Sequence, residues 1–167
     1  MKQLIICVET SKTAATDVLY IDKTIKTFYK IDNNIKLSYI YCEGKSKYNS
    51  KRVISEIKDK KSKIKDSVVI YAFDTDAIDS NATDIKLTSS IESYCNENNY
   101  SFVWFYRDIE EVFLHQSIDN TKKVSEAKKF SNLSNLAKAD EKSLSFNDKV
   151  RYKSNILIVL DKCLTRR

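Results

Sequence analysis

Short apolar runs alternate with longer amphipathic segments over the first two thirds of this chain, and this alternation constrains the fold more than any other feature. Continuous apolar runs are typical of strands buried on both faces of a parallel sheet. Apolar residues at helical spacing predict helices that cover such a sheet. We therefore expect an α/β fold, with a mostly parallel sheet of four or more strands and helices on both faces. The expected strands span residues 3–8, 35–42, 67–73 and 100–106, and the expected helices span residues 14–29, 50–64, 83–96 and 108–115.

The same pattern divides the chain into an α/β domain over residues 1–118 and a C-terminal region over residues 119–167. The stretch from residue 116 to residue 147 is polar, rich in Ser, Asn and Lys, and only weakly patterned, so we expect loops and partly ordered helix there. The run Ile156–Leu160 is too apolar to remain exposed. We expect it to form a helix that packs on the domain, or to contact a second copy of the chain or a partner protein.

The composition is that of an ordinary globular protein, with 42% hydrophobic and 31% charged residues. A net charge of +6 favours polyanionic partners only weakly, because much of it lies in solvated lysine runs. The four cysteines form no Cys-x-x-Cys pair and His115 is the single histidine, which indicates buried free thiols and no zinc site. The first apolar run is too short for a secretion signal, and none approaches the roughly 18 residues of a membrane span. We expect a cytoplasmic protein without membrane contact.

Acidic residues follow two of the expected strands directly. Glu9 comes after the first strand, and Asp74 and Asp76 come after the third. Strands of a parallel sheet all end at one edge, where ligands bind. On an extended chain Asp74 and Asp76 would point the same way and Thr75 would point away. Acids at strand ends also serve as turn formers and helix caps, but this combination favours a shared site.

A group of carboxylates is costly unless protons, ion pairs or a bound cation neutralise it. Oxygen ligands favour Mg²⁺ or Mn²⁺, and such a metal activates water or stabilises charge on a phosphate. The sequence therefore predicts a divalent metal site made by Glu9, Asp74 and Asp76. Lys12, Lys45 and Lys47 lie in loops at the same edge, where they could bind phosphate by charge or could simply be solvated surface residues.

Weaker candidates follow the fourth expected strand. Glu110 and His115 fall on neighbouring turns of one helix. His115 could act as a general acid or base, or could be a half-buried packing residue. Trp104 lies in a strand that is apolar on both faces, which favours a core position over a base-stacking role.

The order of a strand with Glu, followed two β-α units later by a strand with Asp-x-Asp, resembles the TOPRIM domain of topoisomerases, primases, small ribonucleases and OLD nucleases. The nearest likeness is to the small RloB-like branch, whose proteins are encoded near bacterial restriction loci. The resemblance covers about residues 3–118 and implies a Rossmann-like fold. The segments that carry it are residues 4–9, 15–20 and 69–76 and, more loosely, residues 108–115.

The resemblance implies a metal-dependent phosphodiester-cleaving enzyme, a nuclease acting on nucleic acid or a nucleotide, in a setting of bacterial defence. Metal binding and catalysis would fall to Glu9, Asp74 and Asp76. Thr10 stands where the family usually has Gly, so the alternative is a TOPRIM-like module that binds nucleic acid or protein without cleavage. A HAD-type phosphatase is disfavoured, since that family places its Asp-x-Asp on the first strand and has Thr where this chain has Ile78.

Overall fold

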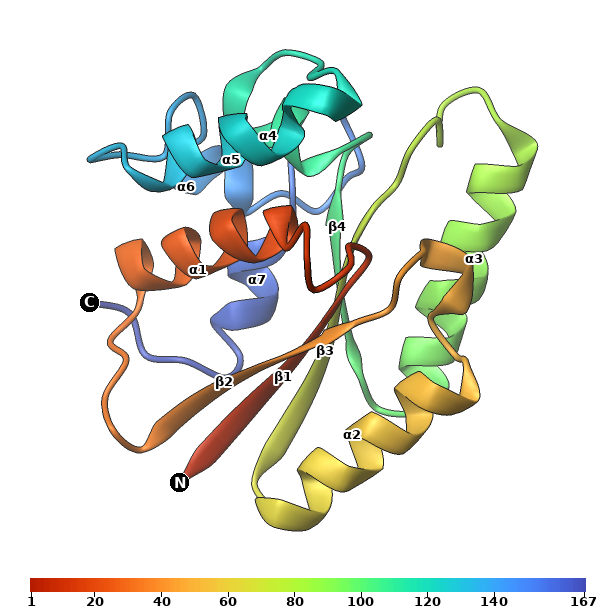
Figure 1. Ribbon diagram of the computed structural model, residues 1–167, viewed down its shortest axis with the longest axis vertical. Helices are drawn as coiled ribbons and strands as arrows, with labels where there is room; N and C mark the ends of the chain where they lie inside the picture. The colour runs from red at the N-terminus through yellow and green to blue at the C-terminus, as the bar shows by residue number, and fades with distance from the viewer.

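A computed structural model describes the whole chain, residues 1–167, and contains one sheet of four parallel strands (Figure 1). The strands lie in the order β2-β1-β3-β4, so the two central strands are β1 and β3. The predicted α/β class with a mostly parallel, helix-covered sheet is confirmed. The strands are β1 (Lys2–Val8), β2 (Ile35–Tyr41), β3 (Ser67–Asp74) and β4 (Ser101–Phe105).

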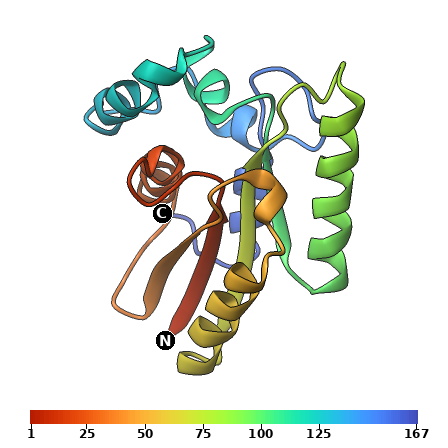
Figure 2. The same ribbon diagram turned by 45° about the vertical axis from the view of Figure 1, so that its right-hand side comes forward.

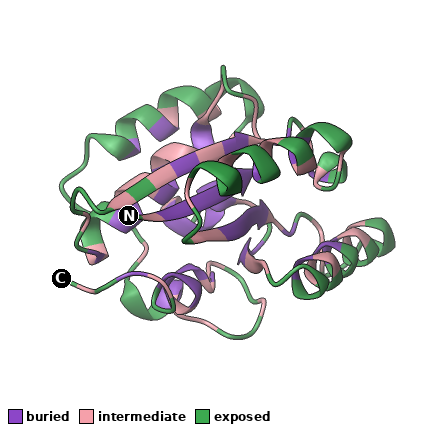
Figure 3. Cartoon of the chain, turned by 90° about the horizontal axis from the view of Figure 1, so that it is seen from below, coloured by how far each residue is buried: buried purple, intermediate pink, exposed green.

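The register of the central strands explains their continuous apolar sequences. Val8, near the end of β1, pairs with Tyr41 of β2 and with Ala72 of β3, so the three strands end at the same level. Residues of β1 alternate between two hydrophobic cores, one on each face of the sheet. Both faces of the strand are therefore buried. Figure 3 shows the buried residues in purple along the strands of the sheet, whereas much of the surrounding helices is green.

Helices cover the two faces unequally, as Figure 2 shows. The helices α2 (Lys51–Lys63) and α3 (Ala82–Glu97) pack on the smaller core. The helix α1 (Thr16–Phe28) packs on the larger core. That core also receives residues from α4 (Ile109–Leu114), α5 (Lys123–Ser131), α6 (Glu141–Leu144) and α7 (Ile156–Leu160).

Side-chain caps set the starts of several helices. The side chain of Ser50 accepts a hydrogen bond from the backbone N–H of Val53 at the start of α2. Asp108 caps α4 in the same way. The apolar residues of α3 are not all buried, since Ile85 is 47% exposed. The buried row of this helix runs instead through Thr88, Ile91 and Cys95.

The apolar run near the C-terminus packs on the domain itself, which is one of the two alternatives that the sequence left open. The residues before α7 protect the free edge of β4: Asn155 accepts a hydrogen bond from Trp104 N at 2.9 Å and donates one to Phe102 O at 3.0 Å. Ser154 forms an isolated antiparallel bridge with Phe105. These contacts satisfy backbone groups that an exposed edge strand would leave unpaired.

All four cysteines are free thiols, as the sequence predicted, and three of them are buried. No helix in the protein combines the length and the apolar character needed to cross a membrane.

Candidate functional site at the carboxyl edge of the sheet

Glu9 and Asp74 meet at the carboxyl ends of two adjacent strands. The carboxylate of Glu9 accepts a hydrogen bond from the backbone N–H of Asp74 at 2.6 Å. The backbone carbonyl of Glu9 accepts one from Gly44, in the loop after β2, at 2.9 Å. The chain segments that follow β1, β2 and β3 are therefore joined at Glu9, as the predicted sheet edge requires.

The Asp-x-Asp segment does not continue as an extended strand. Asp74 is the last residue of β3, and its side chain accepts a hydrogen bond from Ile109 N at 2.9 Å. Thr75 is fully buried and accepts a hydrogen bond from Arg107 N. Asp76 has a left-handed backbone with φ of 52°. The strand alternation that predicted parallel side chains for the two aspartates therefore ends before Asp76.

Asp76 forms an ion pair with a lysine from the loop after β2. The ammonium nitrogen of Lys45 lies 2.8 Å from Oδ2 of Asp76, and the Lys45 side chain is only 7% exposed. The other two lysines of the predicted phosphate-binding set, Lys12 and Lys47, are exposed in the loops after β1 and β2. The edge therefore contains one buried lysine and two exposed ones.

Two further carboxylates belong to this cluster. Asp17 is buried in the first turn of α1, and Glu110 is buried in α4. Glu110 binds Lys123, the first residue of α5, with 3.1 Å between Oε2 and Nζ. A sequence signal was present for Asp17, which lies in a segment that resembles a family motif. None was present for Lys123, because the packing of α5 brings that residue to the site.

Burial dominates the electrostatics of these acids. Burial, followed by the charge of Asp17, raises the pKa of Glu9 to about 8, and the ammonium group of Lys45 opposes the rise. Burial raises the pKa of Asp17 to about 6. Burial and the charge of Glu9 raise the pKa of Asp74. The cluster thus carries more carboxyl groups than its two lysines neutralise, which favours the uptake of protons or of a further cation.

Four of the eight non-glycine residues with a left-handed backbone lie in the loops at this edge. A residue other than Gly costs about 1 kcal/mol or more in this conformation, and the chain has a single Gly. Such residues gather at functional sites in many proteins. Each of the four loops that follow the strands contains one: Ala15, Glu43, Asp76 and Arg107.

The donor atoms at this edge suit a hard divalent cation, while their present arrangement does not form a metal cage. Each carboxylate of Glu9, Asp74 and Asp76 uses one oxygen in the contacts above, and its second oxygen accepts no hydrogen bond from the protein. Oxygen donors of this kind fit Mg²⁺ or Mn²⁺. No three His, Cys, Asp or Glu side chains are grouped so that they could hold a metal ion as they stand. Lys45 and a metal would compete for Asp76.

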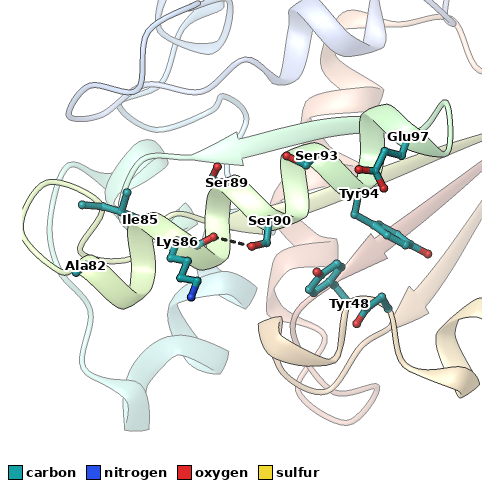
Figure 4. A pocket seen from close by; sticks show the side chains of 10 residues that line it. Tyr48, Ala82, Ile85, Lys86, Ser89, Ser90, Ser93, Tyr94 and Glu97 are labelled. Atoms are coloured by element: carbon teal, nitrogen blue, oxygen red, sulfur yellow. Dashed lines mark hydrogen bonds between the residues drawn. The ribbon is translucent and has the colours of Figure 1, made fainter.

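The carboxyl edge of the sheet, with Glu9, Asp17, Asp74, Asp76 and Glu110, is called the acidic edge below. Two cavities differ in their distance from it. A cavity of about 280 Å³ opens beside Asp76 and is lined also by Asp84, Arg107, Asp108 and Glu111. A larger cavity of about 680 Å³ lies between α3 and Tyr48 (Figure 4). Serines of α3 line the larger cavity, and it contains none of the predicted site residues. The smaller cavity is therefore the one next to the candidate chemistry.

Glu110 and His115, the weaker candidates that follow β4, lie in different environments. His115 ends α4 in a left-handed conformation and stacks on Tyr152, with 4.2 Å between the ring centroids. Burial lowers its pKa. Trp104 is buried in β4, as predicted. Of the two helix residues that the sequence singled out there, only Glu110 belongs to the acidic cluster.

No protein-family model matches this chain, and neither the curated proteins nor the solved structures that were searched include a match. The resemblance to TOPRIM domains therefore stays a prediction from the motifs.

Proposed function

We propose that this protein is a metal-dependent phosphodiester-cleaving enzyme that acts on nucleic acid or a nucleotide. The observation that carries the proposal is the direct hydrogen bond between the carboxylate of Glu9 and the backbone of Asp74, because it joins acids from two adjacent parallel strands at the edge where ligands bind. The motif order that resembles TOPRIM domains supplies the reaction class, and it suggests a role in bacterial defence by analogy alone.

In this proposal Glu9, Asp74 and Asp76 hold Mg²⁺ or Mn²⁺. The bound metal would stabilise negative charge on the phosphate and favour the ionisation of water. Asp74 is held in place by the N–H of Ile109, and Glu9 is held by the N–H of Asp74. Glu9 can then serve as the general base, since a carboxylate must be fixed near the water that it deprotonates.

Phosphate recognition would use the exposed lysines of the neighbouring loops. Lys12 and Lys47 lie at the carboxyl edge with their side chains in solvent. Charged contacts of this kind add affinity that decreases as salt rises. The cavity of about 280 Å³ beside Asp76 offers room for part of a nucleotide.

One observation favours a second candidate function. Lys45 binds Asp76 directly, so the acidic edge is partly neutralised without metal. Together with Thr10 at the position where the resembling family has Gly, this pair fits a TOPRIM-like module that binds nucleic acid or a protein without cleaving it.

Cleavage assays separate the two candidates. Labelled DNA and RNA are incubated with the protein and Mg²⁺, Mn²⁺ or a chelator, over a salt series. The enzyme is expected to cleave at least one substrate only with metal, and Glu9→Gln is expected to abolish cleavage while it leaves binding nearly unchanged. Asp59→Asn, an exposed acid of α2, is the matched control and should retain activity. Salt-sensitive binding without cleavage would identify a nucleic-acid-binding module, and the absence of both would exclude the enzyme and the nucleic-acid-binding module together.

A further inference from the structure

We propose that the ammonium group of Lys45 competes with divalent metal for Asp76 and so sets the affinity of the acidic edge for the metal. The ammonium group must leave Asp76 before a metal can bind there. This inference rests on the proposed metal-dependent function and deepens it. It assigns to Lys45 a role in metal affinity, whereas Lys12 and Lys47 keep the phosphate-binding role.

The environment of Lys45 differs from that of a surface lysine. Lysine side chains are seldom buried unless they are paired, and this one is buried with Asp76 as its hydrogen-bond partner. Its charge also acts on Glu9, where it opposes the effect of burial on the pKa. One ammonium group therefore interacts with two of the three carboxylates assigned to the metal.

The backbone before Lys45 directs the side chain into the site. Gly44 has φ of 125° and ψ of 138°, a conformation that residues with a side chain rarely adopt. Its N–H is bound to Glu9 O at 2.9 Å, and its carbonyl accepts a hydrogen bond from Lys47 N. A Cβ atom built at Gly44 would contact nothing within 4 Å, so conformation and not space requires glycine there. The only glycine of the chain thus lies immediately before Lys45.

The surroundings of Asp76 allow the Lys45–Asp76 ion pair to separate. The Asp76 side chain is 49% exposed, so its carboxylate keeps access to water when Lys45 departs. The other oxygen of Asp76 and one oxygen each of Glu9 and Asp74 accept no hydrogen bond from the protein. A divalent ion can contact several such oxygens and carries twice the charge of the ammonium group, so it can replace that group.

Direct measurement of Mn²⁺ binding tests this role on the full chain. Lys45→Met keeps the length of the apolar side chain and removes the charge. Lys47→Met is the matched control, because Lys47 lies in the same short helix, η1 (Lys45–Lys47), but is exposed. Calorimetric titration should give a dissociation constant up to about fivefold lower for Lys45→Met than for the parent, because the metal no longer displaces a pair worth about 1 kcal/mol. Lys47→Met should match the parent.

A second measurement uses the unmodified protein and needs no variant to fold. An amine-acylating reagent is applied with and without saturating Mn²⁺, and labelling is read at each lysine by mass spectrometry. Mn²⁺ should increase labelling at Lys45 several-fold and leave Lys123 and Lys47 unchanged. Bound Mn²⁺ without increased labelling at Lys45 would overturn the inference, as would equal Mn²⁺ affinity in the parent and Lys45→Met.

The outcomes also distinguish this inference from the proposed function. Suppose that Lys45→Met binds Mn²⁺ more tightly than the parent, and that neither protein cleaves phosphodiesters. This result would support the role of Lys45 and contradict the proposed enzymatic function. Cleavage that requires metal, with no effect of Lys45→Met on Mn²⁺ affinity, retains the enzyme and removes the inference. If neither the parent nor Lys45→Met binds Mn²⁺, the metal site and the role of Lys45 both fall.

Discussion

Lys45 and Lys123 both bind a carboxylate at the carboxyl edge of the sheet, but the burial of their partners is opposite. Lys45 is 7% exposed and binds Asp76, which is 49% exposed. Lys123 is 26% exposed and binds Glu110, which is 1% exposed. In the first pair the lysine is the buried member, and in the second pair the carboxylate is.

This difference indicates which of the two ion pairs costs less free energy to separate. A buried carboxylate that loses its partner keeps an uncompensated charge or takes up a proton, at a cost of several kcal/mol. A half-exposed carboxylate is rehydrated when its partner leaves, so such a pair is worth about 1 kcal/mol or less. Lys123 therefore stabilises the fold around Glu110, whereas Asp76 can be rehydrated when Lys45 leaves, as the proposed exchange with a metal requires.

Removal of Lys123 gives the largest expected effect. Lys123→Met should lower the free energy of unfolding by about 2 to 4 kcal/mol, somewhat below the usual value for a broken buried pair because Lys123 is partly solvated. Lys45→Met should cost about 1 kcal/mol or less. Urea unfolding at pH 7 without metal measures both, with Lys128→Met on the exposed side of α5 as the control. A larger loss for Lys45→Met than for Lys123→Met would reverse the comparison.

A substitution of Gly44 tests how Lys45 reaches its partner. Gly44→Ala should cost about 1 to 2 kcal/mol of unfolding free energy, because alanine is strained at a φ of 125°. It should also shift the Mn²⁺ affinity toward that of Lys45→Met, since the strained backbone would move Lys45 away from Asp76. Ser46→Ala, at an exposed neighbouring position, is the control. Unchanged stability and affinity in Gly44→Ala would show that the glycine does not direct Lys45.

The pH dependence of stability tests the buried carboxylate of Glu9 directly. The pKa of Glu9 rises from 4.5 to about 8 in the folded protein, so between these values the unfolded chain loses a proton that the folded chain keeps. Stability must therefore fall as pH rises through this window and level off above pH 8. Asp17 contributes mainly below pH 6.

Between pH 6 and pH 8 the metal-free protein should lose about 1 kcal/mol or more. Glu9→Gln should remove the part of this decrease that Glu9 contributes and leave the part of Asp74, whose pKa burial also raises. The Gln carbonyl can still accept the hydrogen bond from Asp74 N. Urea unfolding at a series of pH values measures the slope. Identical slopes for the parent and Glu9→Gln would mean that Glu9 is not the group that titrates there.

The sequence was sufficient for the fold and for part of the site. The apolar runs predicted parallel strands, whose carboxyl ends share one edge. The contact between Glu9 and Asp74 also requires β1 and β3 to be neighbours, and the sheet order confirms that they are. The orientation of Asp76 does not follow from local patterns. The left-handed conformation of Asp76 depends on the hydrogen bond from its N–H to Arg107 O, in a loop that follows a different strand.

The ion pairs of Lys45 and Lys123 could not be predicted from the sequence, for two different reasons. Lys45 was recognised as a basic residue at the right edge, but nothing in the sequence distinguished it from its exposed neighbour Lys47. Lys123 depends on the docking of α5 against α1, where Lys23 donates a hydrogen bond to Phe130 O at 2.6 Å across more than a hundred residues. A contact of that kind leaves no periodic signal in the sequence.

Thermal unfolding with and without Mg²⁺ or Mn²⁺ tests most directly whether the acidic edge binds metal. A ligand that binds the folded state raises the melting temperature by mass action. The parent should therefore melt several degrees higher with metal than with chelator. The double variant Asp74→Asn with Asp76→Asn should show no metal-dependent shift, and Asp59→Asn should behave as the parent. An equal response of the parent and the double variant would contradict the metal site at Glu9, Asp74 and Asp76.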